Sequence, residues 1–318
     1  MRHLATVALS LLFAAEAAAQ AYPAKPPRLL VGFVPGGGVD QTARITTAKL
    51  SEAWGPITVE NKVGAGGTIA ADAVAKSAPD GYTFVLCNIG SHGVGPALYK
   101  KIPYDAIRDV TYIGLIGTTP NVLAVHPSVP ANTVAEFIAY ARANPGKLSY
   151  GSSGVGTSTH LGVELFKSMT GINIVHVPYK GGAASSADLV AGQVQLVITN
   201  LPEQVAYIKS GRTRALGVST LKRSPQFPDV PTIAEAGVPG YEVTVWYGLC
   251  GPGGMARSLV ERINADLNRA VSAPETVKRL SDAGIEAAPG TSEFFTEFAR
   301  VENAKWAKVV KDAGVTAD

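Results

Sequence analysis

Short apolar runs alternate with segments of helical periodicity along most of the chain. Runs rich in Val, Ile, Leu and aromatic residues, bounded by Gly, Pro, Asn or Asp, are typical of buried strands. They lie at 28–34, 57–60, 82–88, 112–117, 121–126, 148–150, 172–177, 195–199, 215–219 and 243–249. Helical spacing of apolar residues predicts helices at 40–54, 68–77, 133–143, 161–169, 183–191, 203–210, 258–272, 274–283 and 292–310. Strands that alternate with helices predict an α/β protein with a ligand crevice at strand ends.

The stretch 148–164, LSYGSSGVGTSTHLGVE, is the clearest candidate for a ligand site. Glycines and hydroxyl residues precede a predicted helix, whose first N–H groups have no partner within the helix. Such a helix start suits an anion. The Walker loop, the dinucleotide loop and the serine-hydrolase elbow are each missed by one residue, because Thr157, Thr159 and Val155 replace the Lys, Gly and Gly that they require.

A donor-rich helix start without a charge of its own predicts a carboxylate held by neutral hydrogen bonds. An ordinary connection between a strand and a helix is the alternative interpretation. The candidate contacts in this stretch are Gly156, Thr157, Ser158, Thr159 and His160.

A second glycine loop, 35–40, follows the first predicted strand and resembles the loop at 148–164. Gly36 and Gly37 expose backbone N–H groups and are candidate contacts. Asp40 is expected to cap the following helix, a role that we favour over direct contact with a ligand. Capping boxes are also predicted at 133–136 and 258–261.

Polar and aromatic residues at other strand ends are further candidates. Ser91 and His92 follow the strand 82–88, with ordinary loop polarity as the alternative. Tyr179 and Asn200 stand at the ends of two later strands. Trp246 is expected as a wall of the site or as a core residue.

The first 21 residues are typical of a secretory signal peptide. A basic start is followed by a short apolar segment and small residues, which predict cleavage after Ala19 or Ala21. We therefore expect a soluble mature protein in the periplasm. Its length favours two domains.

Composition narrows the function further. A net charge of +3, spread along the chain, does not favour nucleic acid, and no spacing of His and Cys predicts a metal site. Cys87 and Cys250 could form a disulfide in an oxidising compartment, but the sequence leaves their pairing open.

Several short motifs in fixed order resemble the solute-binding receptors of tripartite tricarboxylate transporters, also called Bug receptors. The resemblance covers about 22–318. It rests on PGG at 35–37, VGAGG at 63–67, APDGYT at 78–83, GTSTHL at 156–161, HVPYKG at 176–181, DVPT at 229–232 and EAG at 235–237.

The resemblance implies a periplasmic-binding-protein fold with two α/β domains, joined by strands that cross near 123–125 and 244–246. One domain would comprise 22–123 plus 247–318, and the other 124–246. The loops 35–40 and 154–160 would hold a ligand carboxylate. Many members of the family have Asp at the position of Thr199, so we do not assign the substrates of the family to this chain.

The expected function is capture of a small carboxylate by hinge closure and delivery to a membrane permease, by a monomer without cofactors. A sensor that docks on a membrane kinase is one alternative. An exported hydrolase using Ser91 or Ser153 with His92 or His160 is another, although it lacks a nucleophile elbow. The expected ligand contacts are Gly36, Gly37, Asp40, Ser91, His92, Gly156, Thr157, Ser158, Thr159, His160, Tyr179, Asn200 and Trp246.

Overall fold

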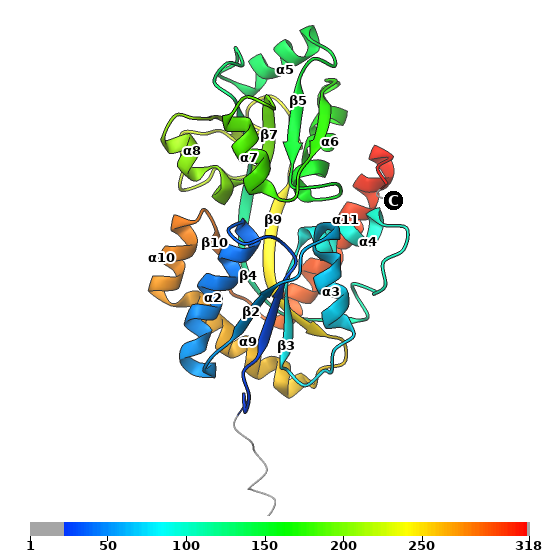
Figure 1. Cartoon of the computed structure of the whole chain (residues 1–318), viewed down its shortest axis with the longest axis vertical. Coiled ribbons are helices and arrows are strands. Elements are labelled where there is room, and N and C mark those ends of the chain that lie inside the picture. The colour runs from blue at the N-terminus through cyan, green and yellow to red at the C-terminus, as the bar shows by residue number, and fades with distance from the viewer. Residues whose placement is uncertain (1–21, 317–318) are drawn as a thin grey trace, which may run out of the picture.

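A computed structural model describes residues 22–316, and the predicted signal peptide with its cleavage sites lies outside them. The elements form two lobes stacked along the long axis of the molecule (Figure 1). Strands alternate with helices through both lobes, so the predicted α/β class is confirmed. Within the described residues, no helix is long and apolar enough to cross a membrane.

The lower lobe in Figure 1 contains the first strands and the C-terminal helices. The strand order is β2-β1-β3-β9-β4, with β1 parallel to its neighbours and β9 antiparallel to both β3 and β4. These strands are β1 (Arg28–Val31), β2 (Thr58–Asn61), β3 (Thr83–Asn88), β4 (Val110–Val125) and β9 (Thr244–Pro252), with the short β10 (Glu286–Ala287) paired to β4. The helices are α2 (Gly38–Trp54), α3 (Thr68–Ala75), α4 (Gly95–Leu98), α9 (Arg257–Ser272), α10 (Pro274–Asp282) and α11 (Ser292–Ala313).

The upper lobe continues the sheet through β7, β5 and β6, with β8 also paired to β4. Its strands are β5 (Ser149–Ser152), β6 (Val175–Pro178), β7 (Leu196–Asn200) and β8 (Arg214–Val218). Its helices are α5 (Val134–Ala143), α6 (Ser158–Thr170), α7 (Gly182–Val190) and α8 (Val205–Lys209). Single-turn segments lie at Ala65–Gly67 and Leu201–Glu203.

β4 joins the lobes as one continuous strand, where two separate strands at 112–117 and 121–126 were expected. It pairs with β9 as far as Pro120 and with β7 from Asn121 onward. Pro120 lacks an N–H group, which predicts a break in a regular ladder. The strand continues because Pro120 lies where β4 exchanges one neighbour for another.

Two local expectations are wrong. Ser91 and His92 are buried in a helical segment, Ile89–Val94, because the Asn88 side chain accepts hydrogen bonds from the N–H groups of Gly90 and Ser91 and starts a turn there. α9 begins at Arg257 after Ala256, without a side-chain cap, so no capping box forms at Ser258.

One of the two hydrogen bonds of the capping box predicted at 133–136 forms, and the other reaches the residue before the capping position. Thr133 Oγ1 accepts a hydrogen bond from the Glu136 N–H group at 3.1 Å. The Glu136 side chain in turn accepts one from the N–H group of Asn132 at 2.7 Å. α5 therefore begins where the sequence places it.

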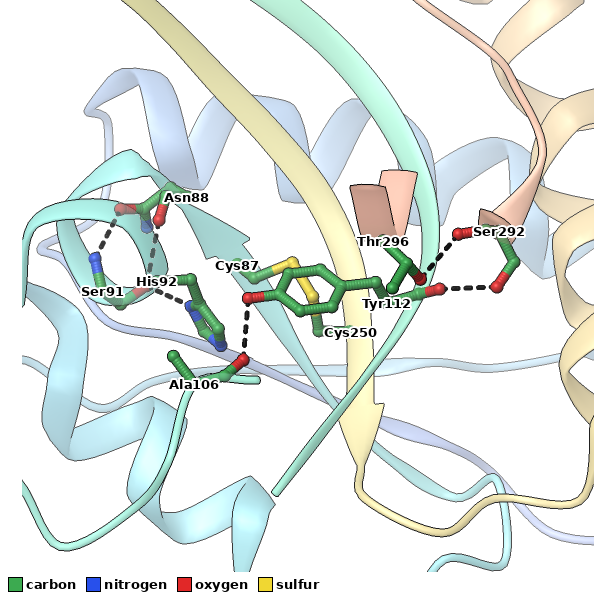
Figure 2. The surroundings of a disulfide bond; sticks show 9 residues. All are labelled: Cys87, Asn88, Ser91, His92, Ala106, Tyr112, Cys250, Ser292 and Thr296. Carbon is green, nitrogen blue, oxygen red and sulfur yellow. Dashed lines mark hydrogen bonds between the residues drawn. A yellow bond between two sulfur atoms is a disulfide. The ribbon is translucent and has the colours of Figure 1, made fainter. Parts of the chain in front are cut away.

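Cys87 and Cys250 form a disulfide, which the sequence had left open. The bond links β3 to β9, with the two Cα atoms 5.8 Å apart. Figure 2 shows it in the core beside His92 and Tyr112. It ties together the two strands that carry Asn88 and Tyr247, which lie directly opposite one another in the ladder.

Replacing both cysteines with serine is expected to lower the free energy of unfolding by about 2–4 kcal/mol. The bond closes a long loop, since the two cysteines are 163 residues apart in sequence. Urea denaturation measures the effect, and reductant should not change the midpoint of the double variant. Equal midpoints for oxidised and fully reduced wild-type protein would contradict this account.

Candidate ligand-binding cleft

A small cavity of about 30 Å³ lies between the two lobes. Both lobes contribute to its walls. They do so through the loop before α2, the end of β3, the starts of α6 and α7, the end of β7, and β9. The lining residues are Phe33, Val34, Gly37, Gly38, Val39, Asn88, Ile89, Gly90, Ser153, Thr157, Ser158, Thr159, Gly181, Gly182, Ala183, Asn200, Glu203, Val245 and Tyr247.

Two glycines, with Phe33, Val34 and Val39, form the α2 side of the cavity. The helix begins at Gly38, and Gly37 occupies the capping position without a side-chain hydrogen bond. A Cβ atom on Gly38 would lie 2.7 Å from the Tyr247 hydroxyl, which is closer than any side chain tolerates. Glycine is therefore required here so that the start of α2 can approach β9.

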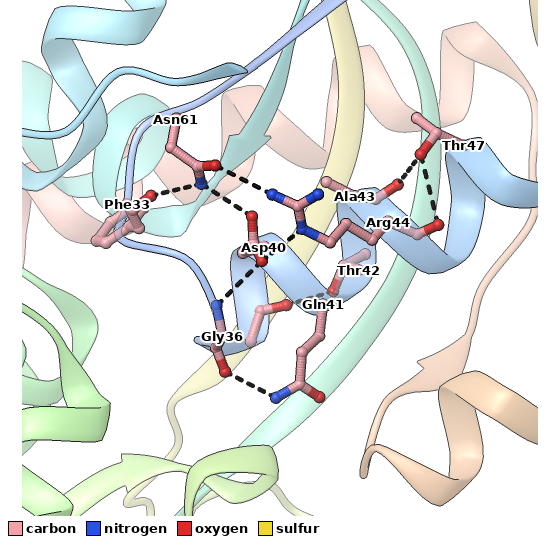
Figure 3. Close-up of polar contacts among 10 residues, drawn as sticks. Phe33, Gly36, Asp40, Gln41, Thr42, Ala43, Arg44, Thr47 and Asn61 are labelled. Carbon is pink, nitrogen blue, oxygen red and sulfur yellow. Dashed lines mark hydrogen bonds and ion pairs between the residues drawn. The ribbon is translucent and has the colours of Figure 1, made fainter. Parts of the chain in front are cut away.

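Asp40 lies in the first turn of α2 and does not cap it, which corrects the sequence expectation. Its buried carboxylate accepts hydrogen bonds from the Gly36 N–H group at 3.0 Å, from Asn61 Nδ2 at 2.8 Å and from Arg44 Nε at 2.8 Å (Figure 3). Burial acts to raise the pKa of Asp40, but these hydrogen bonds outweigh it and hold the pKa below its ordinary value. Asp40 therefore holds the glycine loop in its shape from outside the cavity lining.

The α6 side is a network of hydroxyl groups. Thr157 caps the helix, and its Oγ1 donates to the Gly154 carbonyl at 2.8 Å. Thr159 Oγ1 lies 2.8 Å from Thr157 Oγ1 and accepts from the Ser153 N–H group at 2.8 Å. Both threonine hydroxyls are thus engaged in holding the loop. Ser158 Oγ makes no hydrogen bond to any described residue, so it and the N–H groups of Ser158 and Thr159 are available to a ligand, whereas the His160 N–H group is bonded to Thr157.

Two residues of the predicted site brace this loop from outside the cavity. His160 Nδ1 accepts a hydrogen bond from the Gly156 N–H group at 3.1 Å, and its ring stacks on His176 with centroids 4.1 Å apart. Burial lowers the pKa of His160. The neutral ring is the form that can accept from Gly156, so His160 holds the α6 start in place.

Glu203 is the one carboxyl group among the described lining residues, and it lies against the start of α7. A Cβ atom on Gly182 would lie 1.8 Å from Glu203 Oε2, so this helix start also needs glycine. Thr199 donates a hydrogen bond to the carboxylate, and the N–H groups of Gly38 and Asn200 also stabilise its charge. Burial nevertheless raises the pKa of Glu203 to about 7.

The described lining contains no Lys, Arg or His. Its positive potential comes from the starts of α2, α6 and α7, where N–H groups are free of intrahelical partners. Three lining atoms are buried without a hydrogen-bond partner: Ser153 Oγ, Asn200 Oδ1 and Tyr247 Oη. Buried polar atoms in native structures are normally satisfied, so these atoms are positioned for a polar guest.

The expected contacts divide into three groups. Gly37, Thr157, Ser158, Thr159 and Asn200 line the cavity. Gly36, Asp40, Gly156 and His160 support the two loops from outside the lining, and Tyr179 donates a hydrogen bond to Asp188 at 2.7 Å. Ser91, His92 and Trp246 are buried in the core of the lower lobe.

Trp246 is a core residue and not a wall of the site. Its neighbours Val245 and Tyr247 face the cavity, and successive side chains of a strand point to opposite faces. The indole packs edge-on against Phe295 at 5.7 Å and donates to Glu302 Oε2 at 3.2 Å.

Sequence reasoning missed several lining residues. Asn88 ends a predicted strand, and Gly181 and Gly182 precede a predicted helix, so these positions carried a usable signal. Glu203 carried none, since it looks like an ordinary residue at a helix start. Its place depends on the approach of the two lobes.

The geometry does not support a serine hydrolase. Ser91 Oγ and His92 Nδ1 lie 2.7 Å apart, but both residues are buried, and burial lowers the pKa of His92 to about 3. Ser153 Oγ has no partner among the described residues, and His160 Nδ1 is occupied by the Gly156 N–H group. In residues 22–316 no group of three or more His, Cys, Asp or Glu could hold a metal ion.

Comparisons with known proteins agree with the geometry. Residues 42–315 match the model of the tripartite tricarboxylate transporter family receptor. The chain is 40% identical to the UPF0065 protein in the tcbD-tcbE intergenic region of Pseudomonas sp. strain P51, over 100% of this chain and 95% of that protein.

Solved structures are also similar. The R. palustris protein Rpa4515, solved with adipate, matches with a TM-score of 0.89 and 39% identity, over 93% of this chain and 99% of that one. The periplasmic binding protein BugD matches with a TM-score of 0.87 and 32% identity, over 93% and 100%. The predicted periplasmic-binding-protein fold is confirmed. The chain belongs to the receptor family of the tripartite tricarboxylate transporters, whose members are binding proteins and not enzymes.

Proposed function

We propose that this chain is the periplasmic receptor that captures a small organic carboxylate and delivers it to the permease of a tripartite tricarboxylate transporter. The observation that carries the proposal is the convergence of three helix starts and several neutral donors on one cavity between the lobes. The adipate in the related R. palustris structure supports a carboxylate ligand. The predicted signal peptide supports export.

Hydrogen bonds must supply most of the affinity. A micromolar ligand corresponds to about −8 kcal/mol, and a helix dipole contributes about 0.3–1 kcal/mol at each start. Backbone N–H groups and the hydroxyls of Ser158 and Ser153 are the available donors. Their hydrogen bonds to an ionised carboxylate are the stronger, charge-assisted kind.

Hinge closure is the proposed means of capture. The two domains are 22–123 plus 247–318, and 124–246, and β4 and β9 are the connections at which they would rotate. A ligand that contacts both lobes binds the closed form better and shifts the population toward it. The closed form would then dock on the permease.

A thermal-shift screen tests the ligand class. Mature protein is mixed with organic acids, and with sugars and esters as neutral controls. An acid at about 100 times its dissociation constant should add roughly 2.7 kcal/mol, which raises the melting temperature by several degrees. If a neutral control raised the melting temperature and none of the acids did, the proposed ligand class would be excluded.

Gly37→Val should abolish ligand binding while the protein stays folded. A Cβ atom here has no contact closer than 3.7 Å, so the fold tolerates it, but the branched side chain enters the cavity. Gly37→Ala is the graded control and should weaken binding less. Titration calorimetry measures the carboxylate affinity of both variants, and circular dichroism verifies that they are folded. An unchanged affinity in folded Gly37→Val would show that Gly37 does not line the binding site.

Asp40→Asn should destabilise the protein by about 1–3 kcal/mol at neutral pH and weaken ligand binding indirectly. It removes a buried charge that holds the Gly36 loop and pairs with Arg44 at 2.8 Å. Because the folded-state pKa is depressed, this contribution is present above the unfolded pKa of about 4 and is lost as pH falls through the folded value. Urea midpoints should therefore fall more steeply below pH 4 in wild type than in Asp40→Asn; parallel profiles would contradict the role.

A further inference from the structure

The start of α2 already has an anionic partner within the protein. Glu203, which belongs to the upper lobe, places its carboxyl group at the Gly38 N–H group of the lower lobe. Thr199 and the Asn200 N–H group complete its hydrogen bonds. Gly182 leaves room for it on the far side. An internal carboxylate thus occupies one of the three helix starts around the cavity.

The start of α6 contrasts with that of α2. The one acid of its helix, Glu164, is bonded to Tyr150 and Lys167 at 2.7 Å and does not line the cavity. Ser158 Oγ and the first-turn N–H groups therefore remain unoccupied by any described acid. A ligand carboxylate is best accommodated at this start.

The region around Glu203 contains one charged acceptor and no cation among the described lining residues. The unpartnered Asn200 Oδ1 is a second acceptor, and the neutral Tyr247 hydroxyl, also unpartnered, can accept or donate a hydrogen bond. A second ligand carboxylate would meet a like charge here, whereas a hydroxyl or ammonium group would be held.

We propose that Glu203 selects the ligand class: a small acid with one carboxylate, held at the α6 start, and a hydrogen-bond donor at its far end. This inference rests on the proposed function and narrows it. A second carboxylate would be admitted when Glu203 takes up a proton and becomes a donor itself.

The surroundings of Glu203 allow that protonation near neutral pH. Burial raises its pKa to about 7, although the hydrogen bonds from Thr199, Gly38 and Asn200 act to lower it. The groups that meet it from α2, β7 and α7 are uncharged, and Tyr247 of β9 is the ionisable group that faces it among the described residues. Burial, followed by the charge of Glu203, raises the pKa of Tyr247 well above its ordinary value, so Tyr247 stays neutral.

A ligand series that changes one end tests the inference. Calorimetric titrations at pH 6, 7, 8 and 8.5 compare adipate, 6-hydroxyhexanoate, 6-aminohexanoate and hexanoate, with the corresponding four-carbon series to cover chain length. Wild type should prefer a donor-ended acid at pH 8. Its affinity for the diacid should fall about fivefold from pH 7 to pH 8 and more steeply above pH 8, because the competent, protonated fraction falls by that factor.

Glu203→Gln removes the charge and keeps the shape. At pH 8 it should bind the diacid at least tenfold more tightly than wild type, lose the pH dependence, and bind the aminoacid less tightly. Glu52→Gln, on the exposed far part of α2, is the matched control and should behave like wild type. The wild-type pH series remains a test if Glu203→Gln does not fold.

The outcomes separate the two claims. Diacid binding that is flat in pH and unaffected by Glu203→Gln would overturn the role of Glu203 and leave the carboxylate receptor intact. Failure of wild type to bind any acid of either series at any pH would overturn the proposed function as well.

Discussion

The constraint on which the site depends is that the first N–H groups of a helix have no partner within the helix. α2, α6 and α7 all begin at the wall of one cavity, so donors from both lobes point to the same space. The described lining has no Lys, Arg or His, so these donors supply its positive potential. Glycines at 38 and 182 make this possible, because a Cβ atom at either position would collide with Tyr247 or Glu203.

The strands determine how these helix starts meet. β4 runs through both lobes, and β9 is its antiparallel neighbour up to the boundary between them (Figure 1). The disulfide between Cys87 and Cys250 fixes β9 to β3. It lies one residue before Asn88, which starts the next turn and lines the cavity. Stability and site geometry therefore depend on the same strands.

The sequence predicted what local chemistry determines. Glycine loops before amphipathic helices identified the starts of α2 and α6, because turn and capping preferences act within a few residues. Thr157 and Ser158, which were expected as ligand contacts, line the cavity. Ser91 and His92 were expected in an open loop. The Asn88 side chain accepts hydrogen bonds from the N–H groups of Gly90 and Ser91, and this turn folds the segment into the core. The disulfide and Glu203 could not be predicted, since both depend on segments far apart in sequence coming together.

A crystal structure of the mature protein with a bound carboxylate would test the central claim most directly. The account predicts carboxylate oxygens at about 2.7–3.2 Å from first-turn N–H groups of α6, with Ser158 also in contact. A carboxylate paired with a lysine or arginine, or bound outside the cavity between the lobes, would contradict it.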